Sequence, residues 1–175
     1  MPVWHAVNLE NVEQGGGRNG TMKFTVDGGK PFRFQIPKGR VMYNGVSEYG
    51  SMTIDVPGVF GTWWRETLEP ALVGGLVPFN SNLKESGLRI KVDKSTQLFN
   101  AQKEIQFQDV KEGLLANTVV TCIIEITGTY FFKEVFGLTC RAYQVVVNEV
   151  QPPSAQPETV EEGDEPVKGF AFMGV

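Results

Sequence analysis

Apolar and polar residues alternate in several short stretches of the chain, which is the pattern of half-buried β-strands. Met22–Val26 and Phe32–Ile36 alternate strictly, and the Asp27–Lys30 stretch between them contains two glycines that favour a tight turn. These residues predict a hairpin over 22–36, preceded by a Gly-rich polar loop at residues 11–20. Further strands are predicted at Arg40–Asn44, Ser51–Val56 and Leu88–Val92, and a weaker one at Glu104–Phe107. In Leu88–Val92 the apolar residues share one face, and Arg89 and Lys91 share the other.

The second half of the chain contains the two stretches most favourable to strands. Thr118–Thr127 is rich in β-branched residues and predicts a strand that is buried on both faces. Gly128 then predicts a bulge or a bend before a strand at Tyr130–Lys133. The last predicted strand, Leu138–Val147, ends shortly before two consecutive prolines.

One stretch favours a helix, Thr62–Val73, with Thr62 as its N-cap and two glycines directly after it. About eight short strands with a single interposed helix predict a mainly β fold, an OB-fold-like small barrel. A two-sheet sandwich is the alternative architecture. The domain prediction is an N-terminal segment with the Gly-rich loop (1–20), a barrel domain (21–150) and a disordered tail (151–175).

The charge of the chain is unevenly distributed. The net charge is −4, and residues 151–175 carry all of it, because they hold five acidic residues against Lys168 alone. This tail has four prolines, lacks hydrophobic periodicity and ends in apolar residues, which predicts a disordered acidic segment with an aromatic tip. It can occupy a basic groove, dock a partner or only increase solubility. The predicted partner-binding residues are Glu161, Glu162, Asp164, Glu165, Phe170 and Phe172.

The rest of the chain is neutral overall but has a local excess of positive charge. Six basic residues lie between positions 18 and 40, with Asp27 as the one acidic residue among them. Such clustering favours contact with a phosphate backbone, although lysine and arginine also solvate the outer faces of most antiparallel sheets. The candidate phosphate contacts are Lys23, Arg33, Arg40, Arg89 and Lys91, and the candidate base-stacking residues are Tyr43, Tyr49 and Trp64.

Catalytic and metal-binding patterns are missing from the sequence. His5 is the only histidine, and there is no nucleophile elbow, phosphate-binding loop or pair of C-x-x-C motifs. We therefore predict no enzyme activity, no cofactor and no metal site. Cys122 and Cys140 lie in apolar runs, where buried free thiols are more common than a disulfide. Neither a signal peptide nor a membrane span is predicted, which favours an intracellular location, in the cytoplasm or nucleus and in a host cell if the protein is viral.

Three features together resemble the single-stranded-DNA-binding proteins of the phage gene-2.5 type and their relatives in large eukaryotic DNA viruses. These features are the barrel-like strands, the basic stripe with aromatic residues and the acidic tail with its aromatic tip. The runs at residues 87–93, 96–99, 126–131 and 137–147 also look like the viral members. The resemblance covers about residues 20–148 and the tail. In the phage proteins the aromatic residue is the last one, whereas here three residues follow Phe172.

The resemblance implies an OB-fold that binds single-stranded DNA regardless of sequence, in replication, recombination or repair. It also implies a tail that competes with DNA and recruits replication proteins such as a DNA polymerase, and it leaves a homodimer open. The alternative is a non-enzymatic virion structural or adaptor protein with a β-sandwich fold, in which the basic patch contacts another protein.

Overall fold

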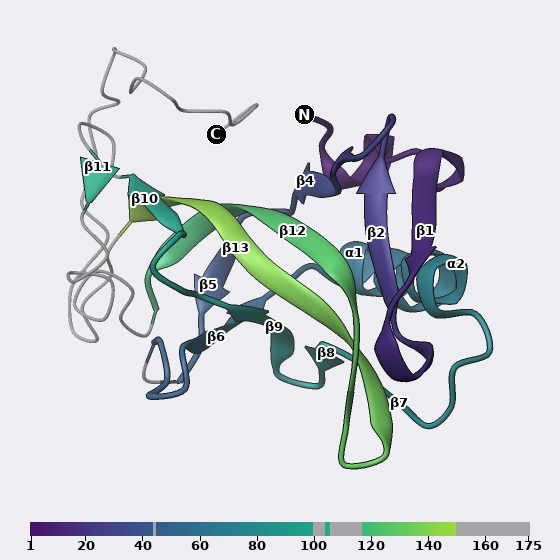
Figure 1. The fold of residues 1–175 in the computed structure, drawn as a ribbon. Helices are drawn as coiled ribbons and strands as arrows, with labels where there is room; N and C mark the ends of the chain where they lie inside the picture. The colour runs from purple at the N-terminus through teal and green to yellow at the C-terminus, as the bar shows by residue number, and fades with distance from the viewer. Residues whose placement is uncertain (44, 100–103, 106–116, 150–175) are drawn as a thin grey trace.

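The centre of the molecule is a closed β-barrel (Figure 1). The computed structural model describes residues 1–43, 45–99, 104–105 and 117–149. The barrel is a ring in which β12 pairs with β5, β5 with β6, β6 with β9, β9 with β13, and β13 again with β12. The ring strands are β5 (Gly39–Val41), β6 (Ser51–Asp55), β9 (Gly87–Lys91), β12 (Val119–Phe132) and β13 (Val135–Glu149). The prediction of an OB-like small barrel is confirmed, since the sheet closes on itself as an OB-fold does and not as a sandwich.

Shorter strands extend the sheet on both sides of the ring. β2 is adjacent to β12 and carries β1 on its far side, while β10 pairs in parallel with β13 and carries β11. The remaining short strands pair with β2, β12, β13 and β9 in turn. These added strands are β1 (Val12–Gly16), β2 (Met22–Val26), β3 (Lys30–Pro31), β4 (Arg33–Gln35), β7 (Phe79–Asn80), β8 (Leu83–Lys84), β10 (Gln97–Phe99) and β11 (Glu104–Ile105).

The predicted hairpin over residues 22–36 is only partly correct. The turn after Val26 does reverse the chain, but β2 pairs with the two-residue β3 and not with β4. β4 pairs instead with β12, placing Arg33 opposite Glu125. The Gly-rich stretch at 12–16, expected to be a loop, is strand β1, because β2 offers it a complete antiparallel partner.

The helical segment is longer than predicted and runs from Gly58 to Val73 as α1 (Gly58–Trp63), the π-helical turn η4 (Trp64–Leu68) and α2 (Glu69–Val73). Thr62 is not its N-cap, because the helix begins four residues earlier, directly after Pro57. Gly74 ends it with φ 51°, as the two glycines predicted. The helix lies beside β1, and the Gln14 side-chain amide donates a hydrogen bond to the Ala71 carbonyl (Figure 1).

Aromatic side chains pack the helix and the N-terminal segment onto the barrel. The Trp4 ring lies 5.4 Å from the rings of both Phe60 and Trp63, and Phe34 contacts Trp63 edge-on at 5.6 Å. Trp4, Val7, Leu9 and Val12 of this segment pack against the main core. Three 3₁₀ turns connect this part of the chain, η1 (Trp4–Ala6), η2 (Leu9–Asn11) and η3 (Arg18–Gly20).

β12 and β13 form the longest strand pair, which crosses the face of the molecule diagonally in Figure 1. The predicted irregularity at Gly128 is confirmed as a register shift between Ile126 and Gly128. The strand nevertheless continues unbroken to Phe132. Only glycine fits at position 128, because a Cβ would come within 2.2 Å of the Met22 carbonyl oxygen, where β2 crosses β12. Cys122 and Cys140 are buried free thiols in this pair.

Candidate nucleic-acid interface

The strand register aligns four ionisable residues in one row across the outside of the barrel. Arg33 of β4 is opposite Glu125 of β12, Glu125 is opposite Arg141 of β13, and Arg141 is opposite Lys91 of β9. Residues directly opposite on paired strands have side chains on the same face. The row therefore crosses four strands on one surface, and Ser51 of β6 continues it beyond Lys91.

Glu125 lies at the centre of this row, between two guanidinium groups. Its Oε2 accepts a hydrogen bond from Arg33 Nε at 2.6 Å and lies 3.7 Å from Arg141 Nη1. Its side chain is 13% exposed. The carboxylate thus neutralises part of the charge of both arginines and fixes their positions.

Arg141 has a second acidic partner on its other side. Its Nε lies 3.5 Å from Asp93 Oδ2, and it also donates a hydrogen bond to the Ser95 hydroxyl. Burial alone would raise the pKa of Asp93, but the hydrogen bonds from Ser95 and the positive charge of Arg141 lower it below its ordinary value. Asp93 is therefore ionised at neutral pH and helps to position Arg141.

An aromatic ring completes the row at Arg33. The Arg33 guanidinium carbon lies 3.6 Å from the centroid of the Tyr143 ring, which is a cation–π contact. The sequence-based selection of site residues missed Tyr143 and Arg141. The signal was present, since positions 139, 141 and 143 of the predicted strand Leu138–Val147 are polar or amphipathic while positions 138, 140 and 142 are apolar.

Arg89 and Lys91 occupy the exposed face of β9 as predicted, with Leu88, Ile90 and Val92 buried behind them. Arg89 Nε lies 3.3 Å from the Ser51 hydroxyl, which connects it to the end of the row. The loop between β5 and β6 lies next to this end of the row, because the Val92 backbone amide donates a hydrogen bond to the Gly50 carbonyl at 2.7 Å.

The same loop carries two of the three predicted stacking residues. Tyr43 and Tyr49 are 65% and 81% exposed, which leaves both rings available to a ligand. Tyr49 directly precedes Gly50, at the Lys91 end of the row.

Trp64, the third predicted stacking residue, is contradicted by the structure. Its ring is fully buried, and its Nε1 donates a hydrogen bond to Glu69 Oε1 at 2.7 Å. Adjacent helical residues face in different directions, and here Trp63 is the partly exposed member of the pair. An enclosed indole cannot stack on a base, so Trp64 is a core residue.

The two remaining predicted cations lie outside the row, on strands that flank it. Lys23 is exposed on β2 opposite Gly128, and Arg40 is exposed on β5 opposite Asp55 and Val119. Arg40 and Glu125 are thus six positions apart along β12, about 20 Å in an extended strand. The surface includes Arg33, Arg89 and Lys91, and Arg40 flanks its β9 end: Arg40 is opposite Asp55 of β6, and Thr53, two positions before Asp55, is opposite Arg89.

Other kinds of site have little support in the described parts of the chain. Within those parts no group of three or more His, Cys, Asp or Glu residues could hold a metal ion. Among the helices that the structure describes, none is long and apolar enough to cross a membrane. The predicted tail residues, from Glu161 to Phe172, lie outside the described residues.

The fold and this surface define a class of protein, a small OB-like barrel with a row of ionisable and aromatic side chains on its outer face. Several solved structures share the fold. The single-stranded-DNA-binding protein from bacteriophage Enc34 in complex with single-stranded DNA has a TM-score of 0.53 at 13% identity, covering 83% of this chain and 99% of that chain. The C-terminally truncated form of that protein gives 0.52 at 11% identity, covering 82% and 98%.

The chain belongs to a protein family of unknown function, DUF5871, whose model matches residues 61–161. None of the curated proteins matches the sequence. The low identity to the Enc34 protein means that the likeness establishes the shared fold alone.

Proposed function

We propose that this protein binds single-stranded DNA without sequence preference and that the outer face of the barrel, from Arg33 to Lys91, is the binding surface. The observation that carries the proposal is the row itself, in which cations from three strands converge on the surface of an OB-like barrel. The Enc34 protein, which has this fold, is a single-stranded-DNA-binding protein. OB-folds commonly use one face of the barrel for oligonucleotides.

The surface combines the two elements that sequence-tolerant binding requires. Arg33, Arg89, Lys91 and Arg141 supply positive charge for phosphates, and exposed Tyr49 and Tyr43 supply rings on which bases stack. Phosphate oxygens would compete with Glu125 and Asp93 for the arginines. Both acidic residues already hold the guanidinium groups in position. When DNA binds, phosphates would therefore replace carboxylates as partners of the arginines, and the arginine side chains would not need to move far.

The cellular role belongs to the same proposal. A protein of this kind would coat single strands inside the cell during replication, recombination or repair, without catalysing a reaction. Its acidic tail would compete with DNA for the basic face and recruit replication proteins such as a DNA polymerase. The resemblance of the sequence to the gene-2.5 type proteins supports this role, and a homodimer is compatible with it.

A salt series with labelled oligothymidine tests the proposal. We expect binding that weakens as salt rises, because counterions are released from neutralised phosphates, and single strands preferred over duplex. The double variant R89A/K91A should lower the slope of log K against log salt by about two, one for each lost phosphate contact.

The matched control is K30A/R65A, which removes the same charge from β3 and from the helix, two elements that contribute no residue to the row. It should leave the slope nearly unchanged. Equal losses in the two double variants would mean that only net charge matters, and no binding at low salt would refute the proposal and favour the structural or adaptor protein.

A further inference from the structure

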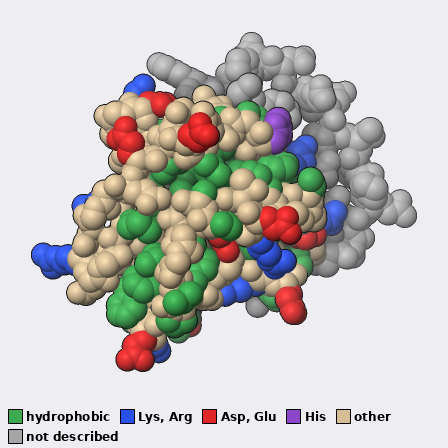
Figure 2. All heavy atoms as spheres, turned by 90° about the vertical axis from the view of Figure 1, so that its right-hand side faces the viewer, with side chains coloured by type: hydrophobic (Ala, Val, Ile, Leu, Met, Phe, Trp, Pro, Cys, Tyr) green, Lys and Arg blue, Asp and Glu red, His purple; other side chains and the backbone are tan. Residues whose placement is uncertain are grey.

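The β12–β13 hairpin ends in a cluster of exposed aromatic side chains that the proposed binding surface does not include. Tyr130, Phe131 and Phe132 are 38%, 43% and 65% exposed. Figure 2 shows hydrophobic side chains gathered at the lower end of the molecule, where Figure 1 places this hairpin. The turn at its tip has two residues with positive φ, Lys133 at 51° and Glu134 at 63°.

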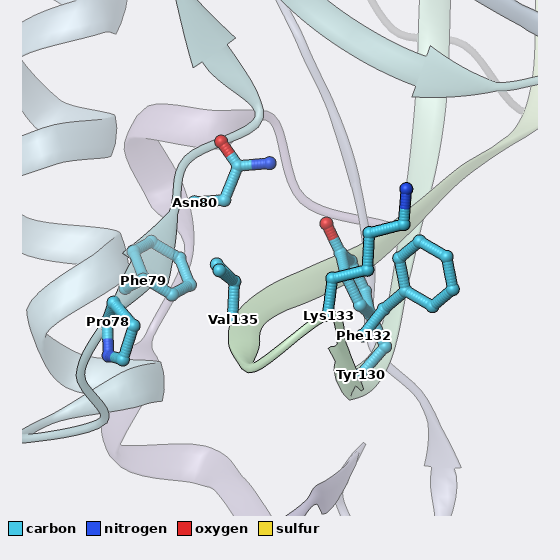
Figure 3. A pocket seen from close by; sticks show the side chains of 7 residues that line it. All are labelled: Pro78, Phe79, Asn80, Tyr130, Phe132, Lys133 and Val135. Atoms are coloured by element: carbon cyan, nitrogen blue, oxygen red, sulfur yellow. The ribbon is translucent and has the colours of Figure 1, made fainter.

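The hairpin forms a pocket with a neighbouring segment of the chain. β7 pairs in parallel with β13, placing Asn80 opposite Gly137. The resulting pocket has a volume of about 470 Å³ and is lined by Pro78, Phe79, Asn80, Tyr130, Phe132, Lys133 and Val135. In Figure 3 the side chains of Pro78 and Phe79 lie on one side, those of Tyr130 and Phe132 on the other, and Val135 between them.

Gly137 places the Tyr130 ring flat on the strand. The two residues are directly opposite in the register. A Cβ on Gly137 would come within 2.3 Å of the Tyr130 ring, so the ring covers the side of β13 toward which that Cβ would point. A glycine at this position is what lets the tyrosine lie there.

The pocket is on the same face of the barrel as the row of cations. Side chains alternate between the two faces along a strand, so positions 137, 139 and 141 of β13 share one face. The register shift between Ile126 and Gly128 inserts the extra residue in β12, leaving the alternation of β13 intact over these positions. Tyr130 therefore lies on the Arg141 face, about 13 Å along β13 at the usual rise per residue.

We propose that this pocket receives an unpaired nucleobase of the same strand whose phosphates lie on the cationic row. This inference rests on the proposed function and assigns that function a base-binding site. Aromatic rings accept any base by stacking, and Lys133 stands at the rim with its ammonium 5.4 Å from the Phe132 ring centroid. Lys84 adds a second cation beside the pocket through its hydrogen bond to the Asn80 side chain.

The surroundings favour a nucleobase as the occupant. The pocket volume lies within the range of about 300–1,000 Å³ that is common for small organic ligands. Its walls are aromatic and aliphatic, its rim is basic, and it continues the surface on which we place the phosphate backbone. A flat aromatic ring attached to an anionic backbone matches all three properties.

The test compares two labelled strands in fluorescence anisotropy at low salt. One is an oligothymidine of about 16 nucleotides, the upper end of the site size of a single OB-fold, and the other is an abasic strand of the same length. The Y130A and F132A variants should each bind oligothymidine about tenfold more weakly, as expected for one lost stacking contact, and bind the abasic strand as the unmodified protein does.

Two further variants separate stacking from simple disruption of the hairpin. F131A is the matched control, since Phe131 packs on Phe136 at 4.8 Å on the opposite face of the hairpin, and its affinity should be unchanged. G137V should weaken oligothymidine binding like Y130A, because the added side chain displaces the Tyr130 ring, whereas Y130F should retain affinity. Thermal melting shows whether each variant is folded.

The outcomes separate the two proposals. If the unmodified protein does not bind oligothymidine, the proposed function itself fails. If it binds, but Y130A and F132A bind as tightly as F131A or lose the abasic strand equally, the base pocket is refuted and the proposed function stands.

Discussion

The surroundings of individual residues change their acid–base chemistry, most clearly at the two cysteines. Both thiols lie in the buried β12–β13 pair. Burial raises the pKa of Cys122, and it raises the pKa of Cys140 to about 12, because a thiolate is poorly solvated inside the barrel. The thiols are therefore protonated and unreactive at neutral pH.

Alkylation with iodoacetamide at pH 8.5, followed by mass spectrometry, should leave the native protein unlabelled and label both cysteines in urea. The folded-state pKa values lie above the ordinary value of 9.0. Protonation of the two thiols therefore favours the folded state fully below pH 9.0. This contribution to the free energy of unfolding is lost as the pH rises from 9.0 toward the folded-state pKa values. Rapid labelling without urea would contradict the burial of the thiols.

At the residue scale, the alternation of apolar and polar residues correctly predicted which side chains are buried and which are exposed in short, regular strands. Arg89 and Lys91 were assigned to one exposed face from the sequence alone, and the structure confirms that assignment. The contact between Arg33 and Glu125 could not be found in this way, because it joins residues 92 positions apart and depends on the register of β4 against β12.

The prediction of Trp64 as a base-stacking residue was wrong for a reason that involves the whole helix. Helical periodicity predicts that the rings of Trp63 and Trp64 point in different directions, but it does not predict which of the two is buried. That depends on where the helix begins and on the wider π-helical turn at Trp64–Leu68, and neither was visible in the sequence.

We expect the W64A variant to lose about 3–5 kcal/mol of unfolding free energy, as measured by urea denaturation. The fully buried ring packs against Phe60, and its indole N–H donates to Glu69, which the Ser81 hydroxyl also contacts. The folded fraction of the variant should bind single-stranded DNA normally. Normal stability with lost DNA binding would instead restore Trp64 as a stacking residue.

At the element scale, the ring strands were predicted better than the strands added to them. Each predicted strand of the ring overlaps an observed one, although Thr118–Thr127 and Tyr130–Lys133 are parts of the single strand β12. β1, β7, β8 and β10 have no sequence pattern of their own, being short or rich in glycine. Their conformation comes from a neighbouring strand that offers hydrogen-bond partners, which is a tertiary effect.

At the scale of the whole molecule, the distribution of charge connects the fold with the proposed function. The first 150 residues are neutral overall, yet the outer face gathers Arg33, Arg89, Lys91 and Arg141 around two carboxylates. The net charge of −4 resides entirely in residues 151–175. A protein whose pI is about 5.1 can therefore still present a basic surface to an anionic ligand.

This separation of charge leads to a prediction for the full chain. Deleting residues 151–175 should tighten binding of oligothymidine at low salt by about fivefold, the equivalent of ~1 kcal/mol for interactions between exposed charges. The gain should shrink as salt rises, because screening weakens the competition between the tail and DNA. Anisotropy titrations of the two proteins across a salt series measure both effects.

A full-length variant in which Glu161, Glu162, Asp164 and Glu165 are replaced by their amides distinguishes charge from chain length. It should reproduce most of the gain in affinity for oligothymidine. The F170A/F172A variant should weaken the binding of partner proteins and change the salt dependence of DNA binding less. If the deletion and the amide variant both bind as the unmodified protein does, the tail does not compete for the basic face. The cationic row would then bind DNA without self-inhibition, and the role of the tail would be limited to its partners.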